Sequence, residues 1–162
     1  MKTLIILRHG KAELHQFGMS DYDRGLMSRG VKNSVAMGKF IAKKWGIPQL
    51  VLSSSAKRAY ETAVLAAEGL GINRNEIQVD DNLYLVSERR ILRILSELPD
   101  EIESCLLVGH NPGLTDLINY FEVWLDNLPT ASAACFTFKE KSWKKITDAK
   151  AKLEWIKLAR EL

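Results

Sequence analysis

The sequence predicts an α/β protein, a three-layer α/β/α sandwich in which helices cover both faces of a mostly parallel sheet with an antiparallel edge. Short apolar runs of strand length alternate with segments whose apolar residues recur at helical spacing, and the last third of the chain is rich in strand-like segments. No repeat, low-complexity tract or linker-like stretch interrupts the chain, so we expect one domain over residues 1–162.

The first elements can be taken in chain order. The apolar run Thr3–Leu7 predicts a strand buried on both faces. Ser28 is expected to N-cap a helix that Gly46 and Pro48 end. The residues at helical spacing that predict its buried stripe are Val31, Val35, Gly38, Ala42 and Trp45. A second buried strand, Leu50–Leu52, is expected to stop at three consecutive serines.

The middle of the chain repeats this alternation. A helix that begins near Lys57 or Arg58 is predicted by the stripe Ala59, Ala63, Ala66 and Leu70, with Gly69 and Gly71 closing it. A third strand is expected at Ile77–Val79, and Ser87 is expected to cap a helix closed by Pro99. The apolar run Cys105–Val108 predicts a fourth strand, which turns through Gly109–Gly113 into another helix.

The last third predicts strands rather than further alternation. Ala133–Phe138 is expected to be one strand, and Leu153–Ile156 is a second candidate. The sequence around the second segment, LEWIKLAREL, is also compatible with a helix, so both assignments stay open.

Composition and charge restrict the class of protein. The apolar runs are too short to span a bilayer, and the basic residues are not interleaved with aromatic ones, so neither membrane nor nucleic acid is an expected partner. Net charge is +3, yet residues 139–162 carry +4 and the rest −1. The basic tail is either a solvated lysine-rich edge or a weak steering field for an acidic or phosphorylated partner. Cys105 and Cys135 lie in apolar runs and are expected to be buried reduced thiols of a cytoplasmic protein.

Polar residues follow three of the predicted strands. Arg8-His9-Gly10 follows the first strand, Ser53 to Arg58 follows the second, and Gly109-His110-Asn111 follows the fourth. Ligands of open α/β sheets bind at the carboxyl ends of the strands, so we expect these groups to converge. No cluster has metal-ligand spacing and no glycine-rich loop precedes a Lys-Ser/Thr pair, so neither a metal nor a nucleotide cofactor is predicted.

Three motifs in this order carry a resemblance to a known family. LRHG near the start, SSSAKRAYET in the middle and LLVGHNPGL later resemble the signatures of the histidine phosphatase superfamily, which has the phosphoglycerate-mutase-like fold. The segments DYDRGLMSRG and LPTASAACFTF are similar to its small SixA-like phosphohistidine phosphatase branch. The resemblance implies that His9 is the nucleophile and that Arg8, Arg58 and His110 surround the phosphate.

Elementary chemistry agrees with these roles. Guanidinium groups suit a phosphoryl group because their planar fork binds two oxygens and stays charged. For His9 to attack phosphorus, one ring nitrogen must be free while a partner holds the other, and the backbone carbonyl of Gly10 is the expected partner. His110 beside a phosphate dianion is expected to have a raised pKa and to act as a third cation.

Departures from the family pattern bear on the substrate. Lys11 and Ala12 follow RHG where mutase-like members usually carry an acidic residue and Ser or Thr, and no helical insertion provides a lid. Glu88 is the one candidate proton donor, although an acidic residue in the first turn of a helix is also favoured there by the helix dipole. Sugar phosphates expel an alkoxide, which needs a proton donor, whereas phosphohistidine can expel neutral imidazole.

These features predict a phosphatase that removes phosphate from phosphohistidine on a partner protein, as a monomer or weak dimer. Two alternatives stay open. One is a phosphomonoesterase that hydrolyses a small phosphate ester at the same site. The other is a non-catalytic module that binds phosphate or phosphoprotein through its arginines.

Overall fold

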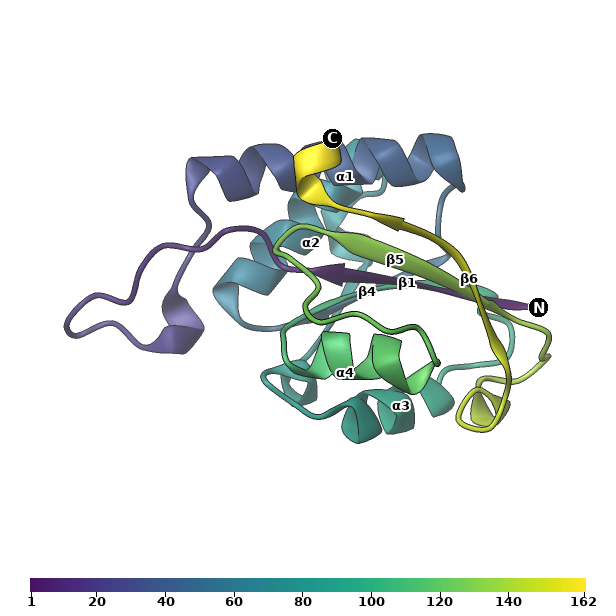
Figure 1. Ribbon diagram of the computed structural model, residues 1–162. Coiled ribbons are helices and arrows are strands. Elements are labelled where there is room, and N and C mark those ends of the chain that lie inside the picture. The colour runs from purple at the N-terminus through teal and green to yellow at the C-terminus, as the bar shows by residue number, and fades with distance from the viewer.

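A six-stranded sheet runs through the middle of the molecule, and helices cover both of its faces (Figure 1). The computed structural model describes residues 1–162. The strand order is β3-β2-β4-β1-β5-β6, and the first four strands in that order are parallel. The strands are β1 (Lys2–Arg8), β2 (Leu50–Ser54), β3 (Ile77–Asp80), β4 (Ser104–Gly109), β5 (Ala133–Phe138) and β6 (Ala151–Lys157). The helices are α1 (Ser28–Lys44), α2 (Lys57–Leu70), α3 (Glu88–Ser96) and α4 (Gly113–Tyr120).

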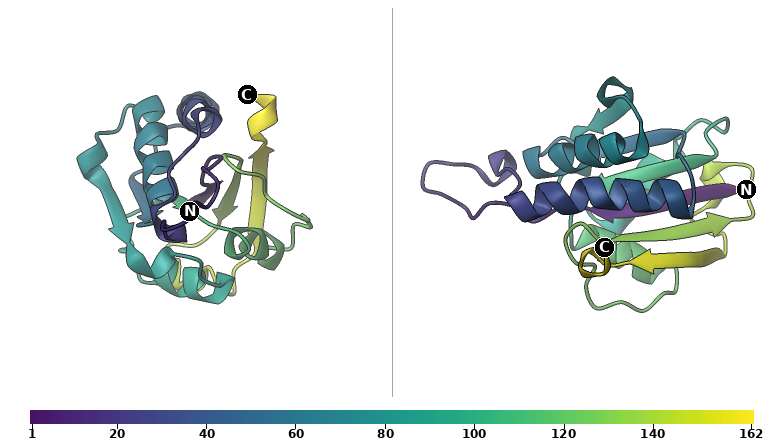
Figure 2. Two further views of the ribbon diagram at one scale, coloured as in Figure 1. Left: turned by 90° about the vertical axis from the view of Figure 1, so that its left-hand side faces the viewer. Right: turned by 90° about the horizontal axis from the view of Figure 1, so that it is seen from above.

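The central strand β1 shows why two helical layers are needed. Successive side chains of a strand point to opposite faces of the sheet. Leu4 and Ile6 therefore join the apolar cluster beneath α3 and α4, while Ile5 and Leu7 join the cluster beneath α1 and α2. All four side chains are fully buried, as expected for a strand covered on both faces. The predicted three-layer α/β/α architecture is confirmed, and Figure 2 shows the same layers from two further sides.

The antiparallel edge consists of β5, which pairs with β1, and β6, which pairs with β5. The segment that sequence alone left open between helix and strand is therefore a strand. A register shift at Cys135/Phe136 turns Trp155 toward the α1 side of the sheet while Leu153 and Ile156 pack against the opposite cluster. Both faces of β6 thus contact the core.

Helix α1 differs from the prediction at its N-terminus and in its buried face. Ser28 is its first residue rather than its cap, because Met27 occupies the N-cap position, and Val31 is exposed. The buried residues of α1 are Gly30, Ser34, Met37, Gly38 and Ile41. Gly38 faces α2 where the two helices lie very close, since a Cβ on it would stand 2.1 Å from the carbonyl oxygen of Ala66, and Gly30 faces the backbone of Lys11. Gly38 of the predicted stripe is buried, and Ala42 and Trp45 pack against the core, whereas the buried Gly30 and Ser34 were not predicted.

Helix α2 and its flanks agree better with the sequence. Its predicted stripe Ala59, Ala63, Ala66 and Leu70 is buried, and Gly71 caps its end with a left-handed φ of 79°. Gly69 lies inside the helix and contacts α1 instead of closing α2. The serines before α2 do not stop β2 where expected, because the strand continues through Ser54. Both cysteines are buried and free, and none of the helices has the length and apolarity to cross a membrane.

Candidate functional site

The three polar segments meet at the carboxyl ends of neighbouring strands. His9 follows β1, His110 follows β4, and Arg58 lies in the first turn of α2 after β2. The ring centroids of the two histidines are 5.2 Å apart, and Nε of Arg58 lies 3.4 Å from Nε2 of His9. The three segments therefore lie close together, as the sequence predicted. They line a cavity of about 380 Å³ together with further residues; the full lining is Arg8, His9, Lys11, Ala12, Leu14, Asp21, Arg24, Arg58, Leu85, His110, Asn111 and Thr130.

His9 is held in one tautomer by its surroundings. Its side chain is buried, and Nδ1 lies 2.8 Å from the carbonyl oxygen of Gly10. Because a carbonyl can only accept, Nδ1 carries the ring hydrogen and Nε2 keeps its lone pair. Burial lowers the pKa of His9 to about 4; the Gly10 carbonyl opposes this, and the charges of Arg58 and Arg8 reinforce it. His9 is therefore a neutral imidazole near neutral pH.

Gly10 makes this geometry possible. A Cβ at this position would lie 2.9 Å from both the Cα and the carbonyl oxygen of Gly30 in α1. The backbone N–H of Gly10 also donates to Oγ1 of Thr62, whose hydroxyl donates to the carbonyl of Arg58. The turn after β1 is thus attached to the same turn of α2 that carries Arg58.

Two guanidinium groups face this region from different elements. Arg58 is 3% exposed, and its Nη1 and Nη2 donate to the backbone oxygen and to Oδ2 of Asp21, at 2.9 and 3.0 Å. Arg8 ends β1, and its Nη1 donates to the carbonyl of Leu128 at 3.0 Å. The buried Nε of Arg8 has no hydrogen-bond partner in the protein. An anion in the cavity is the kind of acceptor that such a buried donor requires.

His110 is the second buried imidazole. Its Nε2 lies 2.8 Å from Oγ of Ser54, and that oxygen also accepts from the backbone N–H of Ala56. Nδ1 of His110 is buried and has no hydrogen-bond partner in the protein. Burial lowers the pKa of His110 to about 3, and the charge of Arg58 and the charge that His9 gains on protonation add to the effect. Without phosphate, the pKa of His110 is therefore lowered, whereas we expect a raised pKa beside a phosphate dianion. The raised pKa stays a prediction for the phosphate complex.

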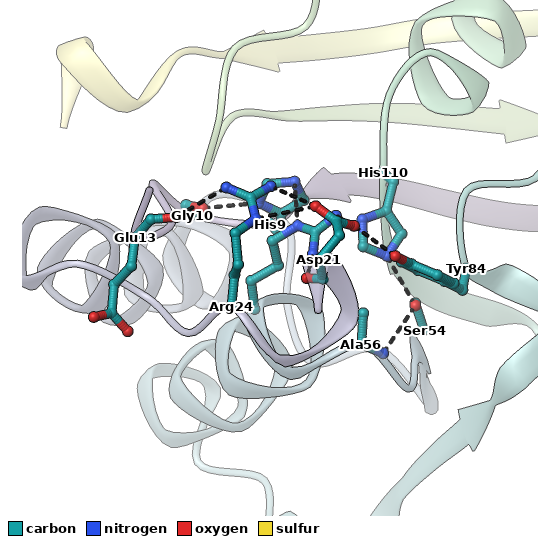
Figure 3. A network of polar contacts seen from close by, with 10 residues as sticks. His9, Gly10, Glu13, Asp21, Arg24, Ser54, Ala56, Tyr84 and His110 are labelled. Carbon is teal, nitrogen blue, oxygen red and sulfur yellow. Dashed lines mark hydrogen bonds and ion pairs between the residues drawn. The ribbon is translucent and has the colours of Figure 1, made fainter. Parts of the chain in front are cut away.

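Asp21 and Tyr84 complete the site, and sequence reasoning gave them little weight. Oδ2 of Asp21 accepts from the Tyr84 hydroxyl as well as from Arg58, and Oδ1 accepts from Nε of Arg24 at 3.0 Å (Figure 3). The Tyr84 hydrogen bond, with the charges and hydrogen bonds of Arg58 and Arg24, lowers the pKa of Asp21 to about 2 against the opposing effect of burial. The Tyr84 ring packs edge-on against His110, with centroids 5.5 Å apart.

Asp21, Asp23 and Arg24 belong to the segment DYDRGLMSRG, whose charged residues could either bound the site or cap a turn. Asp21 and Arg24 line the cavity, while Asp23 accepts from Ser20 and does not. Sequence reasoning missed Tyr84, because Glu88 was the only residue of this segment that it considered as a site residue. Glu88 is the first residue of α3 and is not among the residues that line the cavity, so its role as a proton donor stays a prediction.

No group of three or more His, Cys, Asp or Glu side chains lies close enough together to hold a metal ion. A larger hollow, of about 510 Å³, lies around Met1 at the opposite end of the sheet and contains neither a histidine nor an arginine. The chemistry-bearing side chains are therefore gathered at one end of the sheet.

Comparison with known proteins identifies relatives of this arrangement. Residues 4–85 match the sequence model of the histidine phosphatase superfamily (branch 1). An uncharacterized chloroplastic protein of Arabidopsis thaliana is 25% identical over 151 residues, which cover 88% of this chain and 69% of that protein.

Solved structures match almost the whole chain. The protein histidine phosphatase SixA complexed with tungstate superposes with a TM-score of 0.82 and 21% identity, covering 98% of this chain and 97% of the other. A protein described as the phosphohistidine phosphatase SixA of Agrobacterium tumefaciens gives a TM-score of 0.79 and 24% identity, covering 96% and 97%. These likenesses confirm the predicted fold.

Proposed function

The chain belongs to the histidine phosphatase superfamily, and from this premise we propose that residues 1–162 form a single phosphatase domain that acts through a covalent phosphohistidine on His9. The observation that carries the proposal is that Nε2 of His9 is unprotonated. Nε2 of His9 keeps its lone pair because Nδ1 faces the Gly10 carbonyl, and it lies next to Arg58 in a cavity lined by four Lys or Arg side chains.

The reaction divides into two displacements. In the first, the Nε2 lone pair attacks phosphorus in line, a P–Nε2 bond forms, and the bond from phosphorus to the leaving group breaks. In the second, water attacks phosphorus, the P–Nε2 bond breaks, and the electron pair returns to His9 while a water proton passes to the released phosphate. Each displacement spreads negative charge over the equatorial oxygens, which Arg8, Arg58 and His110 are suited to stabilise.

We propose phosphohistidine on a partner protein as the substrate. Asp21 is the one carboxyl group that lines the cavity, and a pKa of about 2 makes it an anion, so it cannot protonate a leaving alkoxide near neutral pH. Phosphohistidine whose other ring nitrogen is protonated expels neutral imidazole and needs no such donor. Leu14 and Leu85, which line the cavity, are 77% and 52% exposed, so the rim is accessible to a side chain on another protein's surface.

We propose a cytoplasmic location, since both cysteines are unpaired and disulfides are rare in that compartment. Lys11, Arg24 and the basic tail are suited to an anionic partner.

A substrate panel tests the proposal. We expect a phosphohistidine protein to be dephosphorylated far faster than sugar phosphates. The reverse ranking would make the protein a phosphomonoesterase of small esters, and Glu88→Gln would then be expected to lower that ester activity by about 10²–10⁴-fold. Binding of phosphate without any turnover, unchanged by His9→Ala, would indicate a non-catalytic binding module.

A further inference from the structure

A second, smaller cavity adjoins the catalytic one and shares a wall with it. Its volume is about 270 Å³, and Thr130 lines both cavities. The remaining lining residues are Arg29, Asn33, Pro129, Leu158, Ala159 and Arg160. They come from α1, from the loop before β5 and from the short C-terminal helical turn, which Figure 1 shows in yellow beside α1.

Two positive charges reach this cavity from distant parts of the chain. Arg29 lies in α1 and Arg160 in the turn Ala159–Glu161, and both side chains are exposed. Neither guanidinium forms an ion pair; the pairs of this protein join Arg24 and Arg58 to Asp21, and Lys152 to Glu154. Glu161 follows Arg160 directly, but its Oε1 accepts from the backbone N–H of Leu158 at 2.8 Å. The cavity therefore presents two guanidinium groups that no carboxylate of the protein neutralises.

The wall between the cavities is attached to the catalytic strand. The backbone N–H of Ala131, which follows Thr130, lies 3.0 Å from the carbonyl oxygens of both Arg8 and His9. Ala131 has a left-handed φ of 55°, a conformation that is strained for an alanine and persists where the surroundings hold it. On the far side of the wall, the N–H of Ala159 donates to Oγ of Ser132 at 2.9 Å. The second cavity thus has a fixed position relative to His9.

We propose that this cavity is a subsite for a carboxylate of the protein substrate, an Asp or Glu side chain a few residues from the phosphohistidine. The proposal rests on the proposed function and names a property that its partner must have. A planar guanidinium matches a carboxylate in charge and geometry, and carboxylates are the anions that protein surfaces supply. Arg160 belongs to the basic tail, so one positive charge of this tail lies beside the catalytic cavity.

Two peptides that differ only in charge test the subsite. Both carry one phosphohistidine; one has glutamates and the other glutamines at the flanking positions. We expect the wild-type protein to dephosphorylate the glutamate peptide with a kcat/KM about 3- to 10-fold higher, because exposed ion pairs each contribute little. The double substitution Arg29→Gln and Arg160→Gln is expected to abolish this preference, and its rate on phosphoramidate, which has no second anionic group, is expected to stay at the wild-type level.

The matched control removes two positive charges from the other end of the same helix. Lys43→Gln with Lys44→Gln changes the net charge equally, about 20 Å along α1 from Arg29, and is expected to retain the preference. Equal rates on the two peptides in the wild-type protein, or a preference that survives the arginine substitutions, would overturn the subsite alone. If neither peptide were dephosphorylated, the proposed function would fail and the subsite with it.

Discussion

Nε of Arg58 donates a hydrogen bond to Nε2 of His9 at 3.4 Å, which links the first turn of α2 to the end of β1. The bond is at the long end of the hydrogen-bonding range and therefore weak. This weak hydrogen bond orients the His9 ring. Nε2 can give it up when it forms a bond to phosphorus. The same guanidinium is then positioned for the oxygens of the transferred group.

The first prediction concerns Arg58. Arg58→Ala removes a buried charge that faces the reacting nitrogen, and we expect it to weaken phosphate binding and to lower turnover by about 10²–10³-fold or more. Lys57→Ala, one residue earlier in the same turn and exposed, is the matched control and is expected to keep near-normal rates. Steady-state kinetics with phosphate as competitive inhibitor measure both effects. Near-normal turnover in Arg58→Ala would mean that the site is assigned wrongly.

The second prediction treats Asp21 as a positioning residue. Asp21→Asn replaces a carboxylate that accepts from Arg58, Arg24 and Tyr84 with an amide that accepts at only one atom. We expect kcat to fall about tenfold as Arg58 loses its orientation. Phosphate should bind no more weakly, because a negative charge has been removed from the cavity. Asp23→Asn is the control, and an unchanged kcat in Asp21→Asn would contradict the assigned role.

The third prediction follows from the lowered pKa values of the two buried histidines. An unfolded chain binds protons at His9 and His110 near their ordinary pKa of 6.5, whereas the folded chain does so only near about 4 and about 3. Between these values the unfolded state binds more protons, so the free energy of unfolding must decrease as the pH falls from about 6.5 to about 4. The lowered pKa of Asp21 acts below this window, between 3.8 and about 2.

Urea denaturation at several pH values measures this dependence. His9→Gln is expected to flatten it, because a glutamine cannot titrate, and His15→Gln at an exposed position is expected to leave it unchanged. A stability curve that is equally steep in wild type and His9→Gln would show that His9 does not contribute.

The fourth prediction concerns the close contact of α1 with α2. Gly38→Ala would stabilise an exposed helix by about 1 kcal/mol. Here the added Cβ would meet the Ala66 carbonyl at 2.1 Å, so we expect destabilisation by about 1–3 kcal/mol. Lys32→Ala, on the exposed side of α1, is the control and should change stability by less than about 0.5 kcal/mol. The urea midpoint measures both, and a rise in Gly38→Ala would contradict the packing.

How much could be predicted from sequence differs among these residues for physical reasons. His9, Arg58 and His110 could be placed together because each follows a buried strand, and parallel strands present their carboxyl ends at one edge. Asp21 begins the short 3-10 helix Asp21–Asp23 and Tyr84 lies in a turn, where neither periodicity nor a strand end fixes their position. Their roles depend on hydrogen bonds between segments that are 63 residues apart.

The elements of the fold also differ in how well the sequence predicts them. Burial on both faces made β1 and β4 recognisable as apolar runs. By contrast, Ala151–Lys157 becomes a strand because β5 offers it a free edge, and local propensity does not contain that information. In α1 the predicted Gly38 is buried, but Gly30 and Ser34 were missed, because small residues that allow close approach do not add to an apolar periodicity.

The most direct test of the account is to trap the phosphoenzyme and map the modified atom. After brief incubation with a phosphohistidine protein that carries labelled phosphate, we predict an acid-labile label on Nε2 of His9, absent in His9→Ala and present in His15→Ala. A label on His110, or turnover without any labelled enzyme, would contradict the covalent mechanism.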